Sequence, residues 1–147
     1  MVTRRAPVQK GEARYASGTR RATRRSRVLV VDDEEKLLAV VTLVLQDAHD
    51  VQVTTDAREA LEWIAAGERY DAILCDVMMD PMNGVQFHLE LSRRVPDQAD
   101  RIVFMSGGTW LPSIHAFLAR VPNAFIEKPF TEDALLDIVR AKCKGGS

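Results

Sequence analysis

The chain has 147 residues, 46% of them hydrophobic and 28% charged, which is enough apolar material for the core of one folded domain. It contains no run of about 18 apolar residues and no apolar segment near its start, so neither a membrane span nor a secretory signal is expected. Cys75 and Cys143 stand far apart without metal-binding spacing. This spacing argues against a disulfide framework or a zinc site and predicts a cytoplasmic protein.

Charge is distributed unevenly along the chain. Residues 1–27 carry nine basic residues and one acidic residue, and they show neither large apolar side chains in number nor any periodicity. We therefore predict a basic, disordered N-terminal arm over 1–27 and a folded domain over 28–144. A basic arm is commonly a solvated linker, and it can also attract nucleic acid. No helix-turn-helix or other reader accompanies it, so a nucleic-acid partner is not expected and any such binding would be weak and salt-sensitive.

From residue 28 onward, short apolar runs alternate with helical patterns. The runs predict strands at 28–31, 51–53, 72–75, 102–105 and 124–126. Helices are expected after each strand, beginning near residues 37, 56, 84, 112 and 131. Asp56 and Glu59 have the spacing of a capping box, Gly67 is expected to end that helix, and Thr131 to cap the last one.

Four of the five predicted strands are continuously apolar rather than alternating. Such strands are buried on both faces, which is typical of a parallel sheet covered by helices on each side. The sequence therefore predicts a single α/β domain with a doubly wound parallel sheet.

Polar residues stand where four of these strands end. Asp32 and Asp33 follow the first strand, Asp76 the third, Ser106 the fourth and Lys128 the fifth. Each alone has an ordinary explanation as a cap or turn residue. Together, at the edge of a parallel sheet where ligands bind, they indicate a site for Mg²⁺ and a phosphoryl group.

The residue types fit that chemistry. Clustered carboxylates repel one another unless a cation neutralises them. Asp76 can then act as a nucleophile that forms an aspartyl-phosphate, while Lys128 and Ser106 contact phosphate oxygens.

At this point the chain resembles the receiver domains of two-component response regulators. The matching segments are VLVVDDEE (28–35), DAILCDVMM (71–79), IVFMSGG (102–108) and AFIEKPF (124–130). The resemblance implies a flavodoxin-like sheet with strand order 2-1-3-4-5. It further implies that Asp76 is the phosphoacceptor and that Asp32, Asp33, Asp76 and the backbone carbonyl of Met78 bind Mg²⁺. In their residue patterns, the segments are most similar to receivers of hybrid histidine kinases.

The resemblance also implies a switch and partners. Ser106 matches the switch hydroxyl, Phe125 the switch aromatic and Lys128 the family lysine, followed by a cis peptide bond to Pro129. Phe125 can equally be read as a core residue. The implied partners are a histidine kinase or a histidine phosphotransfer protein, with output or homodimerisation through the helix from 112, the strand at 124–126 and the last helix. No effector domain is expected after the last helix, so the downstream partner would be another protein, which the sequence does not identify.

One segment departs from the family pattern. Asp80 stands where the family commonly has proline, and Pro81 comes one residue later, which predicts an altered loop and adds a charge that could reach the metal. Met78 and Gly108, the neighbours expected to align a hydrolytic water, cannot hold one, so slow self-dephosphorylation is predicted. Trp110 could cover the site or face a partner.

Alternatives to a phosphorylated receiver belong to other classes of protein. A phosphatase of the haloacid-dehalogenase type would need an acidic residue two positions after its nucleophile, where this chain has Met78. The chain is therefore not expected to be an enzyme beyond its own phosphorylation and dephosphorylation. A docking module of the same fold that works without phosphorylation remains the alternative.

Overall fold

A computed structural model describes residues 25–107 and 111–145, in which a five-stranded parallel sheet has the strand order β2-β1-β3-β4-β5. The strands are β1 (Ser26–Val31), β2 (His49–Thr54), β3 (Ala72–Asp76), β4 (Ile102–Ser106) and β5 (Phe125–Glu127). The helices are α2 (Glu35–Leu45), α3 (Ala57–Ala65), α4 (Gly84–Arg94), α5 (Pro96–Ala99), α6 (Pro112–Arg120) and α7 (Glu132–Gly145). The predicted fold class, parallel pairing and strand order are confirmed.

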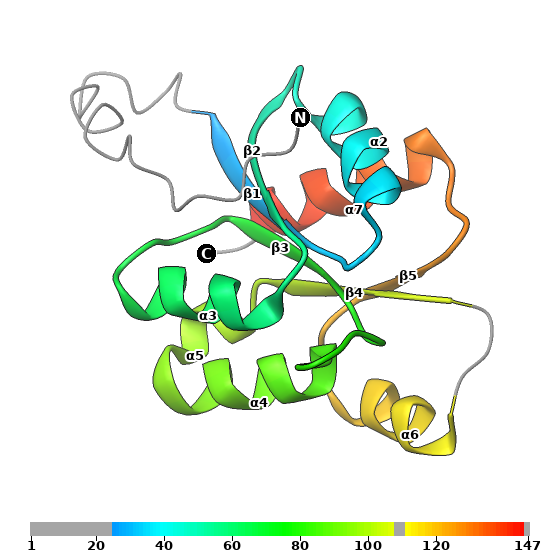
Figure 1. Ribbon diagram of the computed structural model, residues 1–147. Helices are drawn as coiled ribbons and strands as arrows, with labels where there is room; N and C mark the ends of the chain where they lie inside the picture. Colours follow the sequence, from blue (N-terminus) through cyan, green and yellow to red (C-terminus); the bar gives the residue numbers. More distant parts are fainter. Residues whose placement is uncertain (1–24, 108–110, 146–147) are drawn as a thin grey trace.

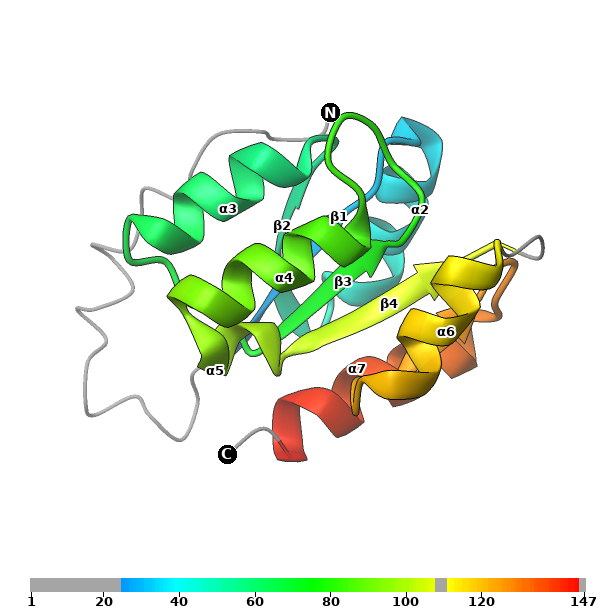
Figure 2. The same ribbon diagram turned by 90° about the horizontal axis from the view of Figure 1, so that it is seen from below.

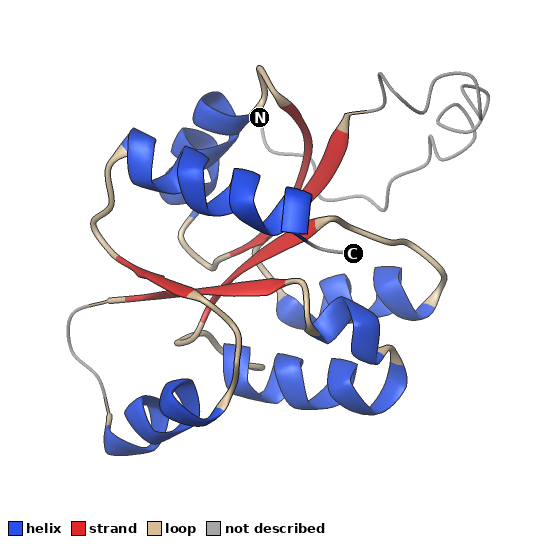
Figure 3. Ribbon diagram, turned by 180° about the vertical axis from the view of Figure 1, so that it is seen from behind, coloured by secondary structure: helices blue, strands red, loops and turns tan. Residues whose placement is uncertain are grey.

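Helices cover both faces of the sheet (Figures 1 and 3). Helices α2 and α7 lie on one face, and α3, α4, α5 and α6 on the other (Figure 2). Two apolar clusters follow from this arrangement, because successive side chains of a strand point to opposite faces. Val28 and Val30 of β1 pack in the cluster with α2 and α7, whereas Leu29 and Val31 pack in the cluster with α3, α4 and α6.

Local signals in the sequence are recovered unevenly. Gly67 ends α3 with a φ of 115°, a left-handed conformation that favours glycine, and the Thr131 hydroxyl accepts from the Ala134 N–H at 3.0 Å as the predicted cap of α7. The predicted capping box at Asp56 is wrong in its second half. Asp56 caps α3, but Glu59 accepts a hydrogen bond from the Thr54 hydroxyl instead of returning to the cap.

Some elements differ from the expected boundaries. The short helix α5 was not predicted, since the chain was expected only to break before Pro96, although proline favours the first helical turn. Strand β5 has three residues, of which Phe125 and Glu127 are exposed.

The first strand begins at Ser26 rather than at residue 28. The arm expected over 1–27 lies outside the described residues except for 25–27, and these three belong to the fold. Arg25 donates to the carbonyl of His49 at 2.8 Å and pairs with Asp50 at 2.9 Å, at the end of α2 and the start of β2. Two arginines assigned to a solvated arm are therefore structural, because Arg27 is paired as well.

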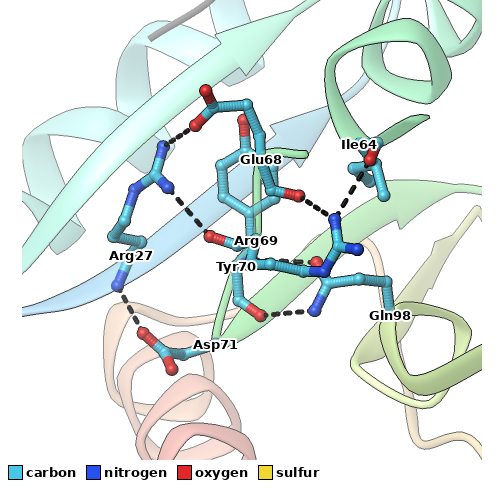
Figure 4. Close-up of polar contacts among 7 residues, drawn as sticks. All are labelled: Arg27, Ile64, Glu68, Arg69, Tyr70, Asp71 and Gln98. Carbon is cyan, nitrogen blue, oxygen red and sulfur yellow. Dashed lines mark hydrogen bonds and ion pairs between the residues drawn. The ribbon is translucent and has the colours of Figure 1, made fainter. Parts of the chain in front are cut away.

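Arg27 lies in a polar network at the amino-terminal edge of the sheet (Figure 4). Its guanidinium donates to buried Glu68 at 3.1 Å and lies 4.7 Å from the centre of the Tyr70 ring, while its backbone N–H donates to Asp71 at 2.8 Å. The Gln98 side chain accepts from the Tyr70 N–H at 2.8 Å and donates to the Tyr70 carbonyl at 3.1 Å. This network ties β1, β3 and α5 together at the edge opposite the candidate site.

Candidate functional site

Strand register brings the polar strand-end residues together at the carboxyl edge of the sheet. Val31 pairs with Cys75, so Asp32 and Asp76, the residues that follow them, stand side by side. Ser106 ends the next strand, β4, and Lys128 directly follows β5, which pairs with β4. The sequence interpretation of one shared edge is therefore confirmed in its geometry.

The Lys128 ammonium group bridges the two buried carboxylates. Its Nζ lies 2.7 Å from Asp32 Oδ2 and 3.4 Å from Asp76 Oδ2. Asp32 is completely buried, and its other oxygen accepts the Glu34 N–H at 2.8 Å. Burial alone would lower the pKa of Lys128, but the hydrogen bond and charge of Asp32, with Asp76, raise it. Lys128 is thus a fixed cation beside Asp76.

Three carboxylates crowd this cation. Oxygens of Asp32, Asp33 and Asp76 lie within 4.8 Å of one another, and the Asp33 side chain is exposed toward solvent. Burial and the Asp32 charge raise the pKa of Asp76 to about 6, although Lys128 and the Met78 N–H oppose the shift. Desolvation and Asp32 also raise the pKa of Asp33. Hard oxygen ligands with uncompensated negative charge and one open side fit a divalent cation such as Mg²⁺.

The backbone of Asp76 is held by the start of α4. A side-chain carbon at Gly84 would lie 2.7 Å from the Asp76 carbonyl oxygen and 2.9 Å from the Cα of Val77, so only glycine fits there. The Gly84 N–H donates to the Val77 carbonyl at 3.0 Å. Asn83 and Gln86 form the capping box that starts this helix, which fixes where Gly84 meets the strand.

The two predicted switch residues occupy contrasting environments. Ser106 is buried, and its hydroxyl has no hydrogen-bond partner among the described residues. Phe125 is 40% exposed, so the interpretation of it as a core residue is wrong. The structure therefore has an unpartnered hydroxyl at the end of β4 and an outward aromatic ring on the adjacent strand β5.

Comparison with known proteins decides the family. The pattern described as "Response regulator receiver domain" matches residues 28–140, nearly the whole described domain. The chain belongs to the receiver-domain family of response regulators.

Curated relatives agree with this membership, and solved structures agree with the fold. The receiver domain is 32% identical over 123 residues to the DNA-binding response regulator MtrA of Mycobacterium tuberculosis, an alignment that covers 83% of this chain and 52% of MtrA. It is 29% identical to the Vibrio cholerae chemotaxis protein CheY4, with a TM-score of 0.66 over 79% of this chain and 97% of that one. A response regulator receiver protein from Sinorhizobium medicae matches with a TM-score of 0.71 and 24% identity, over 85% and 99% of the two chains.

This receiver domain spans about half the length of the curated relatives it matches. As a family, receiver domains bind Mg²⁺ and interact with histidine kinases, and they are not enzymes in the usual sense. Among the residues that the structure describes, no helix combines the length and apolar character needed to cross a bilayer.

The loop after Asp76 contains the Asp80–Pro81 segment in which the sequence departs from the family pattern. Both the Asp80–Pro81 and the Lys128–Pro129 peptide bonds are cis, and the second was implied by the resemblance. Asp80 is exposed, its charge raises the pKa of Asp33, and it does not belong to the carboxylate cluster found among the described residues. Gly108 and Trp110, named for phosphate lifetime and for partner contact, lie outside the described residues.

Sequence reasoning missed contacts that are made by backbone atoms. The Thr54 carbonyl accepts the Asp32 N–H at 3.2 Å, so edge strand β2 positions the loop that carries Asp32 and Asp33. No side-chain pattern signals such a bond. The Asn83–Gln86 capping box did have a signal, an asparagine followed three residues later by glutamine before an apolar helix, and it was overlooked.

Proposed function

We propose that this receiver domain takes a phosphoryl group onto Asp76 from a histidine kinase or a histidine phosphotransfer protein, in the cytoplasm, with Mg²⁺ bound by Asp32, Asp33, Asp76 and the Met78 carbonyl. The observation that carries the proposal is the Lys128 ammonium group, 2.7 Å from Asp32 and 3.4 Å from Asp76. It leaves Asp76 as a buried carboxylate beside a cation.

In the proposed step an Asp76 carboxylate oxygen attacks the phosphorus of a phosphohistidine. The oxygen–phosphorus bond forms as the phosphorus–nitrogen bond breaks, and the histidine nitrogen keeps the electron pair and takes up a proton from water. Lys128 stabilises the charge on the phosphoryl oxygens, and Ser106 donates to one of them. A bound Mg²⁺ would add positive charge for the same oxygens. The chain's own contribution is positioning and charge.

The same geometry supports a switch. Ser106 has a hydroxyl without a partner, so a phosphoryl oxygen on Asp76 would give it an acceptor. Movement of Ser106 would vacate space into which the exposed Phe125 can turn. The affected surface is formed by α6, β5 and α7, which we propose as the site of homodimerisation or of contact with a downstream protein.

The proposal is tested by intact mass after incubation with acetyl phosphate and Mg²⁺. Wild-type protein should gain one phosphoryl group, and Asp76→Asn should gain none while keeping its fold. Omitting Mg²⁺ should slow the gain strongly, since three unneutralised carboxylates repel the incoming phosphate. A wild-type protein that neither gains mass nor binds Mg²⁺ would refute the proposal and favour a docking module that works without phosphorylation.

A second test concerns the basic arm. If it bound nucleic acid, affinity for duplex DNA should fall steeply with salt and disappear when residues 1–24 are deleted. The deletion stops at residue 24 because Arg25 and Arg27 hold the fold. We expect no specific DNA binding.

A further inference from the structure

Helix α6 is attached to the rest of the domain by three buried side chains, Ile114, Phe117 and Leu118. It lies at one end of its layer, apart from α3 and α5 (Figures 1 and 2). Along the chain it follows Ser106, and it forms part of the surface proposed above for partners. The contacts that hold α6 against the domain therefore affect the position of that surface.

An aromatic cluster packs α6 against α4 and β4. The His88 ring of α4 meets the Phe117 ring of α6 at 5.4 Å between centroids, with an interplanar angle of 78°. The Phe104 ring of β4 lies 5.8 Å from His88 and 5.3 Å from Phe117. Edge-to-face contacts of this kind are worth about 0.5–1.5 kcal/mol beyond the area they bury. One titratable ring thus stands in the contact between α4 and α6.

The side-chain amide of Asn123 lies beside the His88 ring. Asn123, buried in the connection from α6 to β5, donates its amide hydrogens to the carbonyls of Ala99 and Ile102 at 2.9 and 2.8 Å. These bonds fix its orientation and leave Oδ1 as a buried acceptor with no partner among the described residues. The Asn123 side chain lies within hydrogen-bonding reach of the His88 ring and raises the pKa of His88, but Oδ1 receives no well-formed hydrogen bond from the ring. A buried acceptor without a donor is costly, so a ring that donates to it would gain free energy.

The electrostatics set the resting state. Burial lowers the pKa of His88, while Asn123 and the Asp100 carboxylate oppose this shift without reversing it. Among the described residues, Asp100 is the charged group whose field acts on the ring. At neutral pH the ring is uncharged and packs against the two phenylalanines. When charged, it carries a donor on both nitrogens and loses more hydration in the aromatic cluster.

We propose that His88 is a positioning residue for α6: proton uptake strengthens the contact of its ring with Oδ1 of Asn123 at the expense of its packing on Phe117, and this loosens α6 on the sheet. The device needs no phosphoryl group and does not rest on the proposed function. It would make the α6 part of the partner surface sensitive to pH below the ordinary histidine value of about 6.5.

The first test uses unphosphorylated wild-type protein in metal-free buffer and needs no variant. The His88 ring and the methyl groups of Ile114 and Leu118 are followed by NMR from about pH 8 to about pH 5. The α6 methyl signals should shift with the midpoint of His88, below the ordinary histidine value of about 6.5. Methyl signals that stay still while His88 titrates would overturn the proposal.

The second test compares variants by amide hydrogen exchange, corrected for the intrinsic effect of pH. In the wild type, protection of α6 should fall about threefold to tenfold between pH 7.5 and 5.5 while α2 keeps its own. His88→Phe keeps an aromatic ring and should abolish this fall. His115→Gln removes the exposed histidine of α6 itself and should leave it unchanged. A fall of equal size in His88→Phe would contradict the assignment.

Discussion

The sheet has an amino edge and a carboxyl edge, where its parallel strands begin and end, and buried charges are balanced at the first but not at the second. At the amino edge, the Arg27 guanidinium meets Glu68 at 3.1 Å and stacks on Tyr70, so the buried anion has a matching cation (Figure 4). At the carboxyl edge, Asp32 and Asp76 crowd around Lys128, and the pKa of Asp76 rises to about 6. The first arrangement holds strands together. The second keeps an excess of negative charge that lowers the stability of the fold, which is why we propose it as a binding site.

The largest effect on stability is expected from removing the ion pair at the amino edge. Arg27→Met removes the cation that pairs with buried Glu68 and should lower the free energy of unfolding by about 3 kcal/mol, measured by urea denaturation. Arg140→Met is the control, because its ion pair with Asp137 is exposed and contributes under about 1 kcal/mol. Equal losses of stability in the two variants would show that the Arg27–Glu68 pair contributes no more than an exposed ion pair.

At the carboxyl edge, removing a charged side chain should raise the free energy of unfolding rather than lower it. The folded state binds a proton on Asp76 up to about pH 6, whereas the unfolded carboxyl loses it near 3.8, so stability falls as pH rises through that interval. Asp76→Asn removes this penalty. In metal-free buffer the variant should be more stable than wild type by about 2 kcal/mol at pH 7 and by little at pH 4.

The measurement is thermal or urea unfolding at several pH values, repeated with Mg²⁺. Added Mg²⁺ should stabilise the wild type more than Asp76→Asn, since ligand binding to the folded state raises stability. A wild type that is as stable as the variant at pH 7 would mean that Lys128 already balances the site.

Two buried hydroxyls allow the edges to be compared directly. Neither the Ser106 hydroxyl nor the Tyr70 hydroxyl has a hydrogen-bond partner among the described residues. Removing an unsatisfied buried hydroxyl should be neutral or stabilising, so Ser106→Ala and Tyr70→Phe should each change stability by no more than about 1 kcal/mol. Only Ser106→Ala should slow phosphorylation by acetyl phosphate. A comparable slowing in Tyr70→Phe would mean that the loss of a hydroxyl anywhere in the core disturbs the site.

Strand ends carried most of what the sequence could predict about the site. Asp32, Asp76, Ser106 and Lys128 each follow or end an apolar run, and a parallel sheet brings such ends together whatever the helices do. The fold followed from the same runs, because continuous burial demands helices on both faces.

Contacts between distant segments could not be predicted in this way. Arg27 looks like one more arginine of a basic segment, and only the approach of Glu68 and Tyr70 turns it into a structural residue. His88 stands on a helical face without any motif, and its role depends on Phe117 and Asn123, which lie on other elements. A sequence shows periods and caps, but not which side chains of two elements meet.

The smallest effect concerns the lifetime of the phosphoryl group. Met78, 46% exposed beside Asp76, offers no group that can hold a water in line with phosphorus, so decay of the phosphorylated protein should take minutes or longer. Met78→Asn supplies such a group and should speed decay by roughly threefold to tenfold, followed by intact mass after removal of acetyl phosphate. Leu89→Asn makes a similar change at an exposed position of α4 and should leave the decay rate as it is. Decay of the wild type within seconds would mean that another group aligns the water. The apolar Met78 would then matter for contact with partners rather than for lifetime.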